Sequence, residues 1–409
     1  MVSTLLALAL LAPSPAPAAA DYDVPAFNRC VDRLGRLASA QGVNEAVLDL
    51  HVRPVTPDTS VLRLLDAQPE FKTPIWDYLA GLVDDERVAD GRTMLQRHVA
   101  ILARVQAEYG VDPATVVAVW GVESDFGRIS GSRPLLQSLT TLSCMGRRQE
   151  FFRGELIATL QIIQAGHVTA DKLVGSWAGA FGQTQFMPST FQRIAVDFDG
   201  DGRRDLVDSV ADALASTANY LDRAGWRSGE PWGFEVRLPQ DFDLSVSGRT
   251  ERRPLSYWIG RGVVHADGRP IAPASTTRSA LLLPAGRNGP AFLVFKNFDA
   301  IYAYNAAESY ALAIAHLSDR LRGQGGFVQA WPTDDPGLSR RQRRELQTLL
   351  LQRGHDIGEV DGIIGSNSRA AIRLEQQRLG LASDGRASQG LLRALRSRTT
   401  ATAEDPAAR

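Results

Sequence analysis

The sequence has no excess of either charge and no long apolar run. Its 45 lysines and arginines are balanced by 46 aspartates and glutamates. This balance argues against a nucleic-acid-binding protein, because such proteins concentrate basic residues on one face. No segment reaches the roughly 20 apolar residues that a membrane-spanning helix requires. With 409 residues, of which 44% are apolar, the chain is long enough for two or three domains with a sizeable core.

The first residues lack lysine and arginine but otherwise have the pattern of a signal peptide. An apolar stretch at 5–12 is followed by small residues ending in APAAA, which is typical of a signal peptidase site before Asp21. We therefore expect residues 1–20 to be a signal peptide and the protein to be soluble in the periplasm. No cysteine stands next to the cleavage region, so a lipid anchor is not expected.

Cysteine is scarce, with only Cys30 and Cys144 in the whole chain. In an oxidising compartment the two can form a disulfide bond that ties an N-terminal helix to a segment beyond residue 126. Two buried free thiols are the alternative. The spacing in the sequence does not decide between them, because it says little about distance in space.

Helical periodicity dominates residues 21–324, which we take as one large domain. Between 233 and 300 the period changes: FEVRLP is typical of a strand, and ALLLP and AFLVFKNF around AGRNGP are typical of a hairpin. The pattern predicts a mainly α (α+β) protein with a small β insertion. The expected helices span 25–39, 58–66, 73–82, 91–109, 113–126, 148–164, 209–224 and 305–322.

Glycine, proline and acidic residues cluster after this domain and indicate a linker at 325–337. Residues 338–396 then carry two Asp-Gly turns, EVDGIIG and ASDGRAS, and spacing for three short helices. This unit resembles the three-helix peptidoglycan-binding domain of cell-wall enzymes, and a different small helical bundle is the alternative. Residues 397–409 are predicted to be a disordered tail. The resemblance depends on Leu346, Gln347, Asp361, Gly362, Gly365, Ala371, Ile372 and Gln376.

The stretch AVWGVESDFG places one carboxyl group, that of Glu123, at the end of an apolar helix. Asp112 and Pro113 are typical of an N-cap and first helical position, and Gly127 can end the helix. Burial and the negative end of the helix dipole both disfavour the anion, so we expect a raised pKa and a carboxylic acid able to donate a proton. A glutamate neutralised by an arginine partner is the alternative, and the helix alone does not exclude it.

Two further stretches have the composition of a binding groove. Arg147 and Arg148 are adjacent at the expected start of a helix, where their side chains diverge by about 100°, so at least one should face solvent or ligand. In GSWAGAFGQTQFMPSTF the small residues allow close backbone approach, with tight helix packing as the alternative reading. Its neutral hydrogen-bonding groups and stacking face suit a carbohydrate; they belong to Ser176, Gln183, Gln185 and Phe186.

The stretch DFDGDGRRDLVD has the oxygen spacing of an EF-hand-like calcium loop. The twelfth position is an aspartate, Asp208, which reaches less far than the usual glutamate, so Asp212 one turn along is the alternative last ligand. A merely acidic turn is the competing interpretation of the loop. We expect a structural calcium ion rather than a catalytic metal, held by the loop residues Asp197, Asp199, Asp201, Arg203, Asp205 and Asp208 or Asp212.

Taken in order, GVES, GSWAGAFGQTQFMPST, AVDFDGDG and ASTANYL resemble the membrane-bound lytic murein transglycosylase B family. The resemblance implies a lysozyme-like helical domain that cleaves the bond between N-acetylmuramic acid and N-acetylglucosamine in peptidoglycan glycan strands. The resemblance further implies that cleavage proceeds without water or a catalytic cofactor and leaves a 1,6-anhydromuramic end. Glu123 matches the catalytic acid, and the aspartate loop matches the family's single metal site. The groove residues that the resemblance implies are Tyr78, Arg147, Arg148, Ser176, Gln185, Tyr220, Tyr304 and Tyr310.

The residues themselves are consistent with a one-acid reaction. A retaining or inverting glycosidase needs two carboxyl groups across the bond, whereas Asp125, two positions from Glu123, points about 200° away around a helix. Glu123 would therefore protonate the leaving oxygen, and its carboxylate would then accept the proton of the sugar's own C6 hydroxyl. A hydrolytic muramidase and a catalytically inactive wall-binding scaffold are the competing hypotheses.

Overall fold

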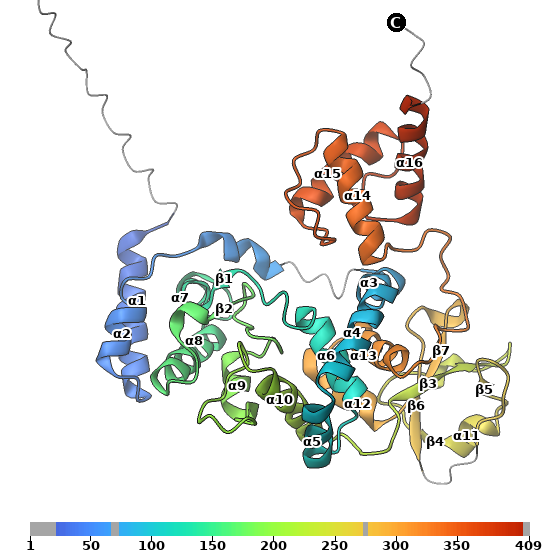
Figure 1. Ribbon diagram of the computed structural model, residues 1–409, viewed down its shortest axis with the longest axis horizontal. Coiled ribbons are helices and arrows are strands. Elements are labelled where there is room, and N and C mark those ends of the chain that lie inside the picture. Colours follow the sequence, from blue (N-terminus) through green and yellow to red (C-terminus); the bar gives the residue numbers. More distant parts are fainter. Residues whose placement is uncertain (1–21, 67–72, 273–276, 404–409) are drawn as a thin grey trace, which may run out of the picture.

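The computed structural model describes residues 22–66, 73–272 and 277–403, and the signal peptide expected at 1–20 lies outside them. The described chain is mainly helical with a small sheet, which confirms the predicted fold class. The chain forms a first helical lobe, a central helical bundle, a β insertion and a C-terminal helical domain (Figure 1). It passes between the lobe and the bundle more than once, and the β insertion lies between two helices of the bundle, α10 and α12. None of the described helices is long and apolar enough to span a membrane.

The first lobe packs its helices around its own apolar core, in which Phe181 and Phe191 are fully buried. A disulfide bond joins Cys30 of α1 to Cys144 of α7, with the two Cα atoms 5.7 Å apart. Two short strands, β1 (Arg133–Pro134) and β2 (Val174–Gly175), pair antiparallel at its edge. The helices of this lobe are α1 (Val24–Ala40), α2 (Glu45–His51), η1 (Thr59–Asp66), α7 (Leu135–Met145), α8 (Gln149–Gln164), η3 (Ala170–Lys172) and α9 (Pro188–Ile194).

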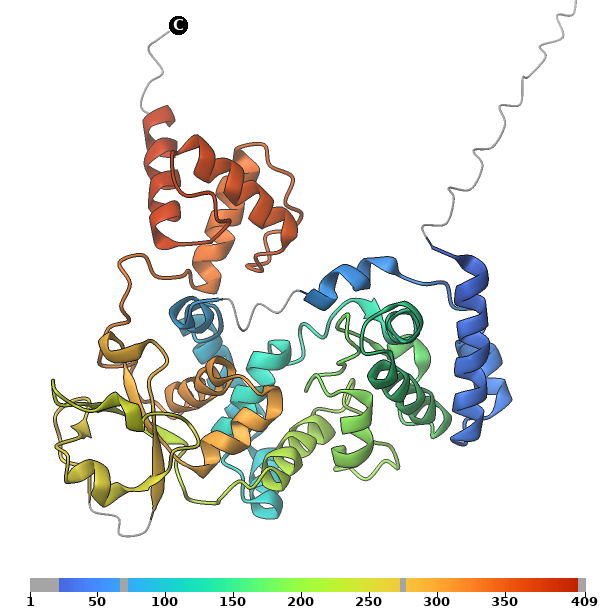
Figure 2. The ribbon, with the colours of Figure 1, turned by 180° about the vertical axis from the view of Figure 1, so that it is seen from behind.

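The central bundle surrounds α6, which is apolar on all sides and therefore buried on all sides. Helix α13 packs against α6 along its length, and α4 and α10 cover two more faces. The views from the front and from behind both show this bundle between the first lobe and the sheet (Figures 1 and 2). Its helices are α3 (Ile75–Leu82), α4 (Asp85–Arg97), α5 (Val99–Tyr109), α6 (Pro113–Ser124), α10 (Val210–Arg223), α12 (Lys296–Asn305) and α13 (Glu308–Leu321).

The β insertion is a five-stranded antiparallel sheet of order β4-β6-β7-β3-β5. Along β6, Ala280 and Leu282 belong to the core of the central bundle while Leu281 faces a separate core beneath α11, so both faces of the sheet are buried. The elements are β3 (Gly233–Arg237), η4 (Leu244–Val246), β4 (Arg253–Pro254), α11 (Leu255–Ile259), β5 (Val264–His265), β6 (Arg278–Leu282), η5 (Gly286–Asn288) and β7 (Ala291–Val294).

The C-terminal domain consists of α14 (Arg340–Gln352), α15 (Ser366–Arg378) and α16 (Gln389–Ala403). Its two Asp-Gly turns are held by the same kind of contact. The Gln347 side chain bonds Asp361 and the backbone N–H of Gly362, and Gln376 repeats this arrangement with Asp384 and Gly385. Buried glutamines on two successive helices therefore fix the two turns that the sequence pattern indicates.

Several predicted elements differ from the observed ones. The helix expected at 91–109 is two helices, α4 and α5, which meet at His98 in a non-helical conformation. The helix expected at 58–66 is the 3-10 helix η1, and only the first half of AFLVFKNF is a strand, since α12 begins at Lys296. Residues 397–403, the first part of the predicted tail, continue α16. Residues 404–409 lie outside the described parts.

Candidate active site

Helix α6 delivers Glu123 to its last turn, as the sequence pattern predicts. The Asp112 side chain caps the helix by accepting a hydrogen bond from the Thr115 N–H, and Pro113 occupies the first turn. Every residue from Ala114 to Gly121 is buried, whereas Glu123 is half-buried. The helix therefore anchors the carboxyl group in the core while leaving it partly accessible.

Two stacked tyrosines lie beside Glu123. The Tyr310 hydroxyl donates a hydrogen bond to Glu123 Oε1, and the Tyr304 ring stacks on that of Tyr310 with centroids 6.2 Å apart. Burial, and after it the negative charge of Glu123, hold the pKa of both tyrosines well above the usual value. The two hydroxyls therefore stay neutral hydrogen-bond donors near neutral pH.

Tyr220 of α10 extends this aromatic group. Its ring centroid is 4.7 Å from that of Tyr304, and its hydroxyl donates to the backbone oxygen of Ala303 at 2.7 Å. Phe186, which the sequence suggested as a sugar-stacking face, is only 2% exposed and packs against Tyr220 and Tyr304. Phe186 therefore supports the rings of Tyr220 and Tyr304 from the protein interior.

The two glutamines of the glycine-rich stretch have different environments. Gln183 is buried, where its side chain accepts from Trp120 Nε1 and donates to the backbone oxygen of Val207, so it fixes the chain against α6. Gln185 is half-buried in a left-handed conformation with φ of 51°. Its amide donates to Ser130 O and Gly182 O. Gln183 is thus a packing residue, and Gln185 is the glutamine available at the surface.

The remaining predicted groove residues come from three separate segments. Tyr78 of α3 is half-buried against the central core. Ser176 is half-buried, and its hydroxyl accepts from Ala180 N. Arg147 and Arg148 are both exposed before α8 begins at Gln149, and the Arg148 guanidinium lies 4.4 Å from the centre of the Phe151 ring. Phe151 itself is 39% exposed.

Glu123 lines a cavity of about 470 Å³ that continues onto the C-terminal domain. Four other carboxyl groups line it, and each has a binding partner. Glu86 binds Arg344, Asp90 binds Arg128, Asp125 binds several arginines, and Asp361 accepts hydrogen bonds from Gln347 and from the Ile363 N–H. Glu123 accepts a hydrogen bond from the neutral hydroxyl of Tyr310.

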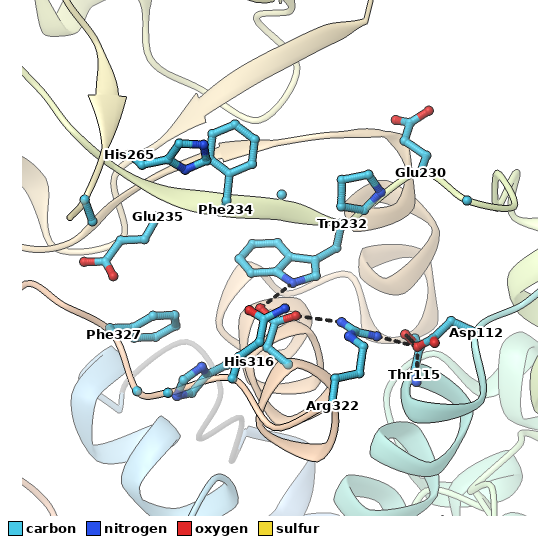
Figure 3. Close-up of a pocket in the computed structure, with 18 of the residues that line it drawn as sticks. Asp112, Thr115, Glu230, Trp232, Phe234, Glu235, His265, His316, Arg322 and Phe327 are labelled. Atoms are coloured by element: carbon cyan, nitrogen blue, oxygen red, sulfur yellow. Dashed lines mark hydrogen bonds and ion pairs between the residues drawn. The ribbon is translucent and has the colours of Figure 1, made fainter. Parts of the chain in front are cut away.

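A larger cavity of about 870 Å³ lies between β3, α13 and the segment after α13 (Figure 3). Its carboxylates are engaged: Asp319 accepts from Trp232 Nε1 and Arg322, and Glu235 accepts from the backbone N–H groups of Val328 and Gln329. Phe327 stacks on His316 at 3.9 Å, and burial lowers the pKa of His316 to about 4. None of the predicted groove residues lines this cavity, whose polar groups hold the linker against the domain.

The aspartate loop brings three carboxylates together, those of Asp197, Asp199 and Asp212, with ligand atoms within 4.8 Å of one another. Asp212 is fully buried at the start of α10. The other predicted loop ligands point elsewhere: Asp208 pairs with Lys172, Asp205 accepts the backbone N–H groups of Val207 and Asp208, and Asp201 lies 3.6 Å from Arg203. The carboxylate set fits a hard cation, and of the two candidates for the last ligand the structure places Asp212 in the cluster.

A helical domain with a tyrosine-bound carboxyl group in a cavity is thus joined to a three-helix domain. The family model of the transglycosylase SLT domain matches residues 26–319, and that of a putative peptidoglycan-binding domain matches 339–395. The chain belongs to the SLT-domain transglycosylase family.

Three relatives show the extent of the similarity. The membrane-bound lytic murein transglycosylase B of Escherichia coli is 32% identical over 281 residues, which cover 63% of this chain and 73% of that protein. The structure of SltB3 from Pseudomonas aeruginosa in complex with NAG-anhNAM-pentapeptide is 49% identical, covers 90% of this chain and 99% of that one, and has a TM-score of 0.73. The E. coli lytic transglycosylase Slt35 in complex with calcium is 28% identical, covers 72% and 93%, and has a TM-score of 0.63.

Proposed function

We propose that the protein is a peptidoglycan lytic transglycosylase in which Glu123 is both the acid and the base. The observation that carries this assignment is the position of Glu123 at the end of a buried helix, hydrogen-bonded to the neutral hydroxyl of Tyr310. The substrate is the glycan strand of peptidoglycan, cleaved between N-acetylmuramic acid and N-acetylglucosamine. The complex of SltB3 with NAG-anhNAM-pentapeptide, a ligand that carries an anhydro-muramic group, supports this reaction class.

In the proposed reaction Glu123 first protonates the glycosidic oxygen as the bond to the anomeric carbon breaks. The muramic ring passes through an oxocarbenium-like state, and the Glu123 carboxylate then accepts the proton of the C6 hydroxyl as that oxygen attacks the anomeric carbon. The sugar supplies its own nucleophile, so no second carboxyl group is needed. This agrees with the ion pairs that occupy Asp125, Asp90 and Glu86 in the same cavity.

The groove residues are assigned by the same proposal. Tyr78, Ser176, Gln185, Tyr220 and Tyr304 would hold the glycan through neutral hydrogen bonds and ring contacts. Arg147 and Arg148, exposed at the start of α8, would bind the more distant, anionic parts of the substrate. The C-terminal domain would hold the enzyme on the wall, and the segment 1–20 would export it to the periplasm.

Replacing Tyr310 by phenylalanine tests the contact to Glu123. We expect kcat to fall about tenfold or more, because a hydrogen bond to a charged group contributes about 1.5 kcal/mol or more and this donor faces the carboxylate formed after proton transfer. Tyr302→Phe is the matched control, since its ring packs under Arg249, which lies in the turn after η4. Equal kcat values for the two variants would show that the Tyr310 hydroxyl does not assist Glu123.

Calcium is proposed as a structural ion held by Asp197, Asp199 and Asp212. Millimolar calcium should raise the melting temperature of the wild type by several degrees, because an ion that binds only the folded state stabilises it. Asp208→Asn should keep this response and Asp212→Asn should lose it. Of these two residues, Asp212 lies in the cluster, whereas Asp208 pairs with Lys172. The comparison is made with and without calcium within each variant, so a change in basal stability does not affect it. The opposite pattern would assign the last ligand to Asp208.

The reaction class is tested by mass spectrometry of digested sacculi, with a hydrolytic muramidase digest as the control. The proposed route releases muropeptides lighter by one water than those of the control, because the muramic end is an anhydro ring. Reducing muramic ends of the same mass as the control would identify a hydrolase. Binding to sacculi without release of any fragment would identify an inactive scaffold.

A further inference from the structure

The C-terminal domain contacts the turn that follows the proposed catalytic glutamate. Arg340, the first residue of α14, donates to both oxygens of Asp125 at 2.6 and 3.2 Å, and its backbone N–H donates to Asp84 at 2.8 Å. Asp125 stands two positions after Glu123 and is the C-cap of α6. A side chain of the C-terminal domain therefore reaches the end of α6, the helix that carries Glu123.

That turn has an unfavourable backbone conformation. Asp125 and Phe126 are consecutive non-glycine residues with φ of 51° and 60°, a region that bulky side chains rarely adopt and that persists only where the surroundings enforce it. The Phe126 ring folds back onto Gly121, where an added Cβ would lie only 2.7 Å from it. The contacts that Asp125 makes thus help to hold the turn on which the direction of Glu123 depends.

The charged side chains in this contact are buried. Asp84, Arg87, Asp125 and Arg340 are each less than 10% exposed, so their ion pairs are screened little by salt. Burial raises the pKa of Asp125, but the hydrogen bond from Arg128 and the charges of Arg340 and Arg87 outweigh it, and the pKa lies below its usual value. Asp125 is therefore an anion. Of its three ion pairs with arginines, the one with Arg340 is the shortest.

We propose that Arg340 is a positioning residue for the transglycosylase reaction: through Asp125 it fixes the turn after α6, so that the docked C-terminal domain orients Glu123 for proton transfer. The domain then has a second role besides holding the glycan. The cavity that contains Glu123 is lined by Arg340, Arg343 and Ile363 of the same domain, which agrees with this arrangement. The inference rests on the proposed function of Glu123.

The test compares two arginines of α14 in the full-length protein. Arg340→Ala removes the contact with Asp125 but leaves the backbone bond to Asp84 and the contacts of Arg343 and Arg344. Arg344→Ala is the control, because it breaks the ion pair between the domains with Glu86 and does not touch Asp125. The substrate is a short soluble glycan fragment, and binding to intact sacculi is measured separately so that loss of wall affinity is distinguished from loss of turnover.

We expect Arg340→Ala to lower kcat about tenfold with little change in KM or in sacculus binding, since small displacements of a catalytic group are costly. Arg344→Ala should keep kcat within about twofold of the wild type. In an Asp125→Asn background Arg340→Ala should have almost no further effect, because the two residues act as one unit. If Asp125→Asn does not fold, the two arginine variants still decide the question.

Wild-type kcat in Arg340→Ala, an equal loss in Arg344→Ala, or multiplicative effects in the double variant would each overturn the proposal. These outcomes do not bear on the proposed function, which is tested separately by the activity of Glu123→Gln and by the mass of the released muramic ends.

Discussion

Replacing Glu123 by glutamine should lower kcat by about a thousandfold or more, because a positioned general acid or base contributes about 10²- to 10⁴-fold and this group supplies both. Glutamine has nearly the same shape, and its amide oxygen can still accept the hydrogen bond from Tyr310. We therefore expect the melting temperature and the binding to sacculi to change little. The measurement is the rate of fragment release from purified sacculi.

Glu86→Gln is the control for this variant. Glu86 lines the same cavity but binds Arg344, so its loss should leave kcat within about twofold of the wild type. If Glu123→Gln retained wild-type activity, or if the two variants lost activity equally, Glu123 would not be the acid. The inactive-scaffold hypothesis would be supported only if the wild type also released nothing.

Removing the disulfide bond by the double substitution Cys30→Ser and Cys144→Ser should lower the free energy of unfolding by about 3 to 5 kcal/mol. The bond closes a loop of 114 residues, and a long loop loses much conformational entropy in the unfolded chain when it is closed. It also holds α1 against α7, where the two helices pack in the core of the first lobe.

Urea denaturation of the oxidised wild type, the reduced wild type and the double variant measures this effect. The reduced wild type and the variant should share the lower midpoint, while kcat at room temperature stays close to that of the oxidised protein, because the bond lies in the first lobe and Glu123 in the central bundle. Equal midpoints for all three would mean that the disulfide does not stabilise the fold.

Local patterns in the sequence predicted those features that are determined locally. The cap at Asp112 and the unbroken apolar run predicted α6 within a few residues and placed Glu123 in its last turn. The two Asp-Gly turns predicted the C-terminal domain because each is bound by a glutamine of a nearby helix. The spacing of the aspartates indicated a cation-binding loop but left its last ligand open. Lys172, 36 residues away, binds Asp208, and the backbone of the loop binds Asp212.

Other features depend on contacts between distant segments and had no signal in the sequence. Gln183 and Gln185 stand two positions apart in one polar stretch, yet only the packing of Trp120 shows that Gln183 is internal. Phe186 was expected at the surface and is covered by two tyrosines from α10 and α12. Asp125 was predicted to point away from the reaction, but its binding to Arg340, which is 215 residues away, could be seen only in the folded chain.

The central claim is that one carboxyl group and the sugar's own hydroxyl accomplish the cleavage, with no water entering the product. The most direct measurement is digestion of a purified glycan in water enriched in oxygen-18, followed by mass analysis of the released muramic ends. Anhydro-muramic ends that carry no heavy oxygen are the predicted result. Reducing muramic ends that carry one heavy oxygen would contradict the account.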